Sequence, residues 1–151
     1  MKKGILYGLL IGGALLMPVE RANVGKLIPV EVVCLRTQGD TVILETDTGE
    51  QGAGGTVEAA YEDMEDTAAG IIYLDTAKYL LVQKTDHMHL ESVCKYLKGD
   101  VRVCCVEQKV NLSEAARYLS VNEPEARLNE VTDEKKLEIL SIENGVMRME
   151  K

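Results

Sequence analysis

Apolar positions along the chain alternate between short β-branched runs, typical of strands, and stripes with helical spacing. Two runs at 30–35 and 41–46 are separated by five polar or glycine residues, so this stretch predicts a β-hairpin. A further strand is expected at 101–106. The runs at 71–74 and 79–82 predict either one kinked strand or a strand followed by a short turn.

Three stretches place apolar residues about three and four positions apart and therefore predict amphipathic helices. Their apolar stripes consist of Val57, Ala60, Tyr61, Met64 and Ala68; of Leu90, Val93, Cys94 and Leu97; and of Leu112, Ala115, Ala116 and Leu119. The expected N-caps are Thr56, then Thr85 or Asp86, then Asn111, which lies three residues before Glu114 as in a capping box. Gly70 and Gly99 are expected to end the first two helices.

Two segments have a less regular pattern. Residues 47–55 contain four glycines and are expected to form a mobile loop. Toward the C-terminus, Asn144 and Gly145 stand between apolar positions and favour a hairpin over 137–149, because Asn-Gly suits a two-residue turn with positive φ. A helix over 132–142 is the alternative.

Strands that alternate with helices of this length imply a partly parallel sheet. Residues 23–151 are therefore expected to form one small α/β domain with a mixed sheet and about three helices, and an α+β arrangement is the alternative. A chain of 151 residues has room for one domain with a substantial core. Because it contains no Phe and no Trp, that core must consist of aliphatic residues and some of the six tyrosines.

The first 22 residues have the features of a signal peptide or membrane anchor. Lys2 and Lys3 precede an uncharged apolar run at 4–17. This run is shorter than the roughly 20 residues that span a bilayer comfortably, which favours a signal peptide over a stable transmembrane helix. Ala22 is the candidate cleavage point, although Glu20 stands where a small residue is preferred.

Such a leader predicts export, either to the extracytoplasmic face of a membrane or, after cleavage, into the medium. A buried first helix of a cytosolic domain is the alternative, but four glycines within the apolar run would weaken such a helix.

The charge of the chain excludes one class of partner. The net charge is −8, and residues 1–22 contribute a net +2, so the remaining residues carry about −10. A surface of this sign repels phosphate backbones, and nucleic acid is therefore not an expected partner.

The four cysteines, Cys34, Cys94, Cys104 and Cys105, allow three interpretations. In the first, all four serve as small buried hydrophobic residues. In the second, one disulfide such as Cys34–Cys94 forms, and in the third, some of the cysteines have a reactive or ligand role. Cys104 and Cys105 are adjacent in a predicted strand, so their side chains point to opposite faces and a bond between them would be strained.

The glycine-rich stretch 49–56 follows a strand, precedes a helix and has the spacing of a phosphate-binding loop. However, Gly55 occupies the position of the essential lysine, and Asp47 and Glu50 add negative charge where a phosphate would lie. Nucleotide binding is therefore not expected, and the sequence indicates no cofactor.

The two histidines, His87 and His89, lie beside Asp86 and upstream of Cys94, Cys104 and Cys105, which are residue types that bind zinc. Residues i and i+2 of a helix point about 200° apart, so His87 and His89 can share an ion only if the helix begins after them. A catalytic Cys94–His89 dyad would place its members on different faces of one helix. We therefore expect solvated histidines, no metal site and no catalytic residue.

Four segments, taken in order over 18–131, carry a resemblance. The first segment is the leader with residues 18–21, followed by a strand from Val30, and the second is the helix opening Gly-Thr-Val-Glu-Ala-Ala at 55–60. The third is the strand 79–82 with the helix end at 93–97, and the fourth is the strand start 100–103 followed by residues 113–119. In this order they resemble the N-terminal domain of the C subunit of spore germinant receptors, the GerAC-like family.

The chain departs from that family in two respects. The family usually starts with a lipidated cysteine and continues into further domains, whereas this chain has no cysteine just after its apolar run and has length for one domain. The resemblance implies a non-enzymatic protein on the outer face of a membrane that supports a receptor or complex. It transfers no catalytic or binding residue.

The predicted function is thus that of a membrane-associated, extracytoplasmic scaffold or partner-binding protein in spore germination or sporulation. Its expected partners are the membrane, through residues 1–22, and other membrane or receptor proteins. The alternative is an exported thiol or zinc-dependent enzyme that uses His87, His89 and the cysteines. An enzyme needs these side chains together in a cleft, whereas a scaffold predicts buried, separated cysteines and exposed histidines.

Overall fold

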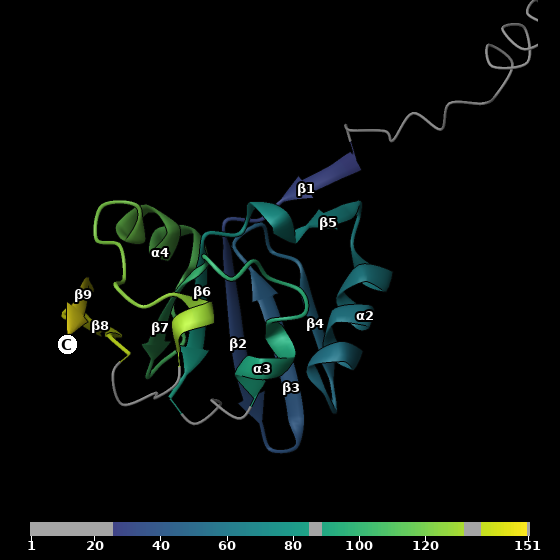
Figure 1. The fold of residues 1–151 in the computed structure, drawn as a ribbon, viewed down its shortest axis with the longest axis horizontal. Coiled ribbons are helices and arrows are strands. Elements are labelled where there is room, and N and C mark those ends of the chain that lie inside the picture. Colours follow the sequence, from purple (N-terminus) through teal and green to yellow (C-terminus); the bar gives the residue numbers. More distant parts are fainter. Residues whose placement is uncertain (1–25, 85–88, 132–136, 151) are drawn as a thin grey trace, which may run out of the picture.

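A mixed sheet of seven strands forms the centre of the protein. The computed structural model describes residues 26–84, 89–131 and 137–150, and the strand order of this sheet is β4-β3-β2-β6-β7-β8-β9 (Figure 1). The strands are β2 (Val32–Gln38), β3 (Thr41–Thr46), β4 (Gln51–Gly54), β6 (Tyr79–Gln83), β7 (Arg102–Val106), β8 (Ile139–Glu143) and β9 (Val146–Glu150). β2, β6, β7 and β8 run parallel, and the remaining pairings are antiparallel. The predicted single α/β domain with a partly parallel sheet is confirmed.

In the described part of the chain, three α-helices cover the two faces of this sheet. α2 (Val57–Thr67) and α3 (Leu90–Val93) bury their apolar residues against one face, and α4 (Leu112–Leu119) buries its apolar residues against the other. The central strands β2, β6 and β7 are covered on both sides, and their consecutive core residues are each at most 5% exposed. Such strands are continuous hydrophobic runs in the sequence, as parallel strands usually are.

Side-chain caps begin the two longer helices where the sequence predicts them. The Thr56 hydroxyl accepts a hydrogen bond from the N–H of Ala59 at 3.1 Å, and the Asn111 carboxamide oxygen accepts one from the N–H of Glu114 at 3.1 Å. The helix ends differ from the prediction, because α2 stops at Thr67 and α3 has only four residues. The expected caps of α3 at 85–86 lie outside the described residues.

The glycine-rich stretch 47–55 is not the mobile loop that the sequence predicts, because Gln51–Gly54 forms β4 and pairs with β3. Its glycines allow α2 to lie directly on the strand. A Cβ atom at Gly52 would collide with the carbonyl oxygen of Ala60 and lie 2.6 Å from the Met64 Cβ, and one at Gly54 would lie 2.6 Å from the Ala59 Cβ. Glycine in a strand thus indicates close approach of another element here, not flexibility.

Both predicted hairpins are confirmed. β2 and β3 meet at the two-residue turn of Gly39, with φ of +62°, and Asp40. β8 and β9 meet at Asn144 and Gly145, which have φ of +52° and +78° as a two-residue turn of the Asn-Gly type requires. The alternative helix over 132–142 is wrong for its second half, which lies in β8, and 132–136 fall outside the described residues.

A second, two-stranded sheet precedes the main one. β1 (Leu27–Pro29), which the sequence did not predict, pairs in parallel with β5 (Ile71–Tyr73). The short 3-10 helix η2 (Leu74–Thr76) then leads into β6, so the strand-and-turn alternative for 71–82 is the correct one. Gly70 does not end α2; a Cβ there would meet the carbonyl oxygen of Lys26, so glycine lets this part of the chain pass beneath the start of β1.

α2 and α3 contact one another through two tyrosines. The rings of Tyr61 and Tyr96 have their centroids 4.5 Å apart with a tilt of 30°. The Tyr61 hydroxyl donates a hydrogen bond to Glu65 at 2.8 Å. Burial, together with this bond to a carboxylate, raises the pKa of Tyr61 to about 12, so the phenol stays protonated throughout the physiological range.

The contact between β4 and α2 gives a first prediction. Gly52→Ala introduces a methyl group into the backbone of α2, and we expect the free energy of unfolding to fall by about 1–3 kcal/mol, the usual cost of overpacking. Gly55→Ala is the control, since no atom lies within 4 Å of a Cβ there; its stability should be unchanged or raised by less than about 1 kcal/mol. Urea denaturation followed by far-UV circular dichroism measures both, and equal losses would contradict the described packing.

Candidate functional site

The first strand of the described chain is tied to the domain by the side chain of Thr76. Its hydroxyl accepts a hydrogen bond from the N–H of Val30 at 3.1 Å. The same hydroxyl lies within 2.9 Å of two carbonyl oxygens, those of Val30 and Tyr73, and donates its hydrogen to one of them at a time. The Asp47 carboxylate accepts hydrogen bonds from the two N–H groups at the start of β2, at 3.0 and 3.1 Å. The passage from β1 to β2 is therefore held by side chains from two other segments.

The two faces of the β1–β5 ribbon have different surroundings. Ile72 points toward the domain and is buried in the core. The other face carries Leu27, Pro29, Ile71 and Tyr73, because side chains alternate along a strand and the register pairs Leu27 with Ile71 and Pro29 with Tyr73. We call these four residues the outer ribbon face. Ile71 is 55% exposed and Tyr73 is 41% exposed, and grouped apolar side chains of this kind mark contact surfaces.

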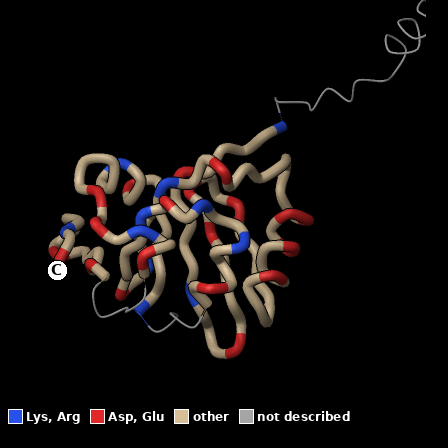
Figure 2. The backbone as a smooth tube through the Cα atoms, viewed as in Figure 1, with Lys and Arg blue, Asp and Glu red and all other residues tan. Residues whose placement is uncertain are grey.

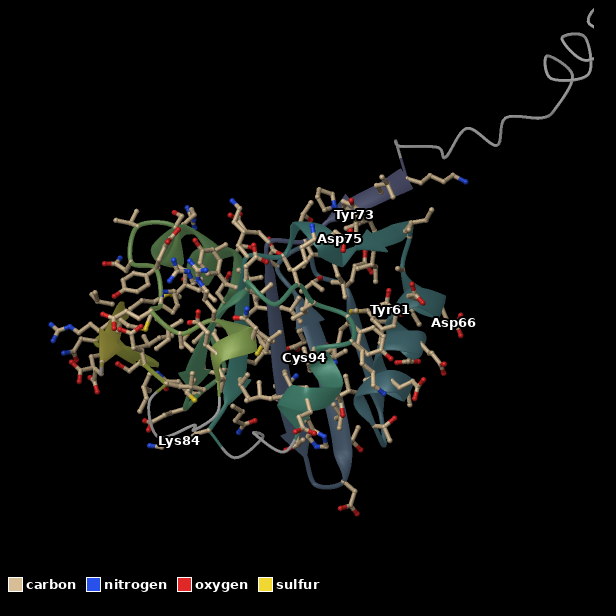
Figure 3. All side chains as sticks on the ribbon, viewed as in Figure 1. Tyr61, Asp66, Tyr73, Asp75, Lys84 and Cys94 are labelled. Carbon is tan, nitrogen blue, oxygen red and sulfur yellow. The ribbon has the colours of Figure 1, made fainter. Side chains whose placement is uncertain are left out.

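The charged residues lie around this face and not on it. Lys26 precedes β1, and Asp75 follows β5 in η2. Figure 3 labels Tyr73 and Asp75 close to β1. Figure 2 shows acidic positions along the outward side of α2, where five carboxylate side chains are exposed: Glu58, Glu62, Asp63, Glu65 and Asp66. The outer ribbon face is thus a small uncharged area on an acidic protein.

A polar cluster lies at the carboxyl ends of the parallel strands β2, β6 and β7. The Arg36 guanidinium donates two hydrogen bonds to the Glu45 carboxylate, at 2.8 and 3.0 Å, and the Lys109 Nζ lies 3.6 Å from the same carboxylate. The hydrogen bond from Arg36 lowers the pKa of Glu45, and the same bond raises the pKa of Arg36.

This cluster lines a hollow of about 120 Å³ together with Cys34, Gln83 and Gln108. The carboxyl edge of a parallel sheet is a frequent position for ligands. Here, however, both cations face the Glu45 carboxylate, so the cluster ties the β2–β3 hairpin to the loop after β7.

Two more open hollows are lined by charged residues. One, of about 270 Å³, lies between the β3–β4 turn and the start of α4, where Glu45, Asp47 and Glu50 surround the glycine-rich stretch with negative charge. The other, of about 290 Å³, lies at the amino ends of β6 and β7, where Lys78 and Arg102 are among the lining residues. These two cations pair with neighbouring carboxylates at 2.8 and 3.6 Å.

The structure separates the cysteines that the sequence grouped as possible ligands. Cys34 and Cys104 are buried on the sheet face beneath α4, whereas Cys105 is buried on the opposite face, as the alternation predicts. Cys94, labelled in Figure 3, is exposed, so the expectation that all four cysteines are buried is wrong for this residue. None of the four, all within the described ranges, takes part in a disulfide, and the suggested Cys34–Cys94 bond is not formed.

The histidines do not complete a site either. His89 is the N-cap of α3 and is half-buried, not fully solvated as expected, and His87 lies outside the described residues. Within 26–84, 89–131 and 137–150, no three His, Cys, Asp or Glu side chains are grouped as metal ligands would be.

The outer ribbon face is the surface that sequence reasoning missed. The sequence does contain a signal for this surface, because residues 27–29 and 71–73 are both short apolar runs. Each run has only three residues, however, and the two are separated by more than forty positions along the chain. Only their pairing in the fold reveals that alternate residues of both runs form one surface.

Comparisons with known proteins give no match: no protein-family model, no curated protein and no solved structure is similar to the chain. The resemblance to the GerAC-like family thus stays a prediction from the sequence. In the part of the chain that the structure describes, no helix is both long and apolar enough to cross a membrane.

The separation of the cysteines predicts how they react. Under native conditions one thiol, that of Cys94, should be labelled rapidly by an aromatic disulfide reagent, while burial of the other three prevents access. Burial also raises the pKa of Cys104, which further reduces its thiolate fraction. Four thiols should react after denaturation, and Cys94→Ser should remove the fast phase. Rapid labelling of more than one native thiol would contradict the described burial.

The Arg36–Glu45 pair predicts a pH-dependent contribution to stability. At pH 7, Glu45→Gln should lower the free energy of unfolding by about 1–3 kcal/mol, because the partly buried guanidinium loses its charged acceptor. The folded pKa of Glu45 lies below its ordinary value of 4.5, so this contribution is complete above that value and is lost as the pH falls through the folded pKa.

The difference between the wild type and Glu45→Gln should therefore shrink below about pH 4 in denaturant titrations. Glu143→Gln is the control, because the exposed Glu143–Arg148 pair, at 3.2 Å, should contribute much less. A difference that is constant from pH 7 to pH 3 would show that the ionised pair does not stabilise the fold.

Proposed function

We propose that this protein is a non-enzymatic, membrane-associated domain on the extracytoplasmic face that binds a receptor or other membrane protein in spore germination or sporulation. It would be a relative of the GerAC-like subunits. The observation that carries this proposal is the position of the β1–β5 ribbon, which connects the hydrophobic leader to the domain and presents an exposed apolar face at that point.

The way the ribbon is attached supports a role as an anchored module. Val30 is hydrogen-bonded to Thr76 through both its N–H and its carbonyl oxygen, so the domain begins within four residues of the start of β1. This connection holds β1, the first strand of the described chain, against the folded domain. Without it, a long flexible segment would let the domain lie at any distance up to the length of that segment.

The placement of the reactive side chains also supports a non-catalytic role. An enzyme that uses the cysteines and histidines would need them in one cleft. Cys104 and Cys105 lie on opposite faces of a covered sheet, and Cys94 lies on the surface beyond α3. Lys78 and Arg102, which line the hollow at the amino ends of β6 and β7, pair with neighbouring carboxylates, which is typical of a solvated surface.

Fractionation of cells that express the full chain tests the proposal. We expect the protein in the membrane fraction, and we expect external protease to degrade it in intact protoplasts. Sequencing the N-terminus of the recovered protein then shows whether residues 1–22 are retained or removed after Ala22. A known cytosolic protein serves as the control for protoplast integrity. A soluble, protease-protected product would contradict both the exported location and the family relationship.

A further inference from the structure

The outer ribbon face is a concentration of exposed apolar side chains. Among the described residues, four large hydrophobic side chains are exposed: Ile71, Tyr73, Val121 and Val146. Ile71 and Tyr73 lie on the same strand and the same face, and the register adds Leu27 and Pro29 from β1. Val121 and Val146 lie singly, in the turn after α4 and at the start of β9, and single exposed apolar residues need no special explanation.

The chain itself brings this face close to the apolar run of the leader. Nine residues, 18–26, separate the end of that run from β1, and even when fully extended they span at most about 30 Å. A leader in the bilayer would therefore hold the ribbon near the membrane surface. Tethering over such a length gives an effective concentration of roughly millimolar, so a weak contact is sufficient.

The chemistry of the face suits the interfacial region of a bilayer. It combines three aliphatic residues with Tyr73, and tyrosine is enriched where apolar chains meet the headgroups because its ring is apolar and its hydroxyl is polar. The acidic side chains of α2 and the net charge of −8 would repel anionic headgroups, so neutral headgroups fit this protein best.

The size of the face favours lipid over a protein partner. A stable protein–protein interface buries about 800 Å² on each partner and involves roughly 20–30 residues. The outer ribbon face consists of four side chains. A small apolar area is enough for a membrane contact when a leader already supplies most of the attachment.

We propose that the outer ribbon face lies against the lipid headgroups and orients the domain on the membrane, an inference that rests on the membrane attachment proposed above. The β1–β5 ribbon would then orient the domain as well as connect it to the leader. It fixes which side of the domain faces the bilayer. β8 and β9, which form the edge of the main sheet opposite β4, lie well to one side of the ribbon in Figure 1.

Single-tryptophan variants of the full chain test this orientation, because the natural chain contains no tryptophan. Ile71→Trp places the reporter on the outer ribbon face, and Val146→Trp places it on β9; the two positions are 55% and 57% exposed and so form a matched pair. Each variant is reconstituted into phosphatidylcholine vesicles whose acyl chains carry bromine, which quenches nearby tryptophan. Flotation of the vesicles measures membrane attachment separately.

We expect both variants to float with the vesicles and bromine to reduce the emission of Ile71→Trp about twofold while leaving Val146→Trp nearly unchanged. Flotation with no quenching at position 71 would overturn the orientation and favour a protein partner for this face, yet leave the membrane attachment intact. Failure to float would overturn the attachment, and the orientation with it. Tyr73→Trp is the second reporter if circular dichroism shows that Ile71→Trp alters the fold.

Discussion

The covering of the central parallel strands on both faces is the constraint on which the rest of the fold depends. The core residues of β2, β6 and β7 are nearly all aliphatic, and no Phe or Trp fills the space between layers. Two layers of helix are therefore required, and they must lie close to the sheet. The glycines of β4 permit this for α2, because Gly52 and Gly54 have no side chain where the helix backbone passes.

Because the central strands are covered on both faces, polar side chains lie at the ends of the strands and on the outer sides of the helices. Arg36, Glu45 and Lys109 meet where β2, β6 and β7 end, and the five acidic residues of α2 are exposed. Within the sheet, cysteine serves as a small apolar residue, and burial keeps three of the four thiols from reagents.

The β1–β5 ribbon joins this structural argument to the proposed role. It contains the first strand of the described chain, Thr76 fixes it to the start of the main sheet, and its outer face leaves Ile71 and Tyr73 exposed. A rigid, apolar ribbon at that point can set the orientation of a whole domain relative to a membrane. The remaining acidic surface would then be directed toward solvent and partner proteins.

The sequence by itself determined the α/β class, the caps Thr56 and Asn111, both hairpins and the opposite directions of Cys104 and Cys105, because these depend on local spacing and turn chemistry. The tertiary structure alone decided the rest. β4 pairs with β3 and its glycines admit α2, Cys94 lies exposed at the end of a four-residue α3, and the outer ribbon face forms because two distant three-residue runs pair. Contacts between residues far apart in the chain leave no periodic signal in either partner, and so the candidate site emerged only from the fold.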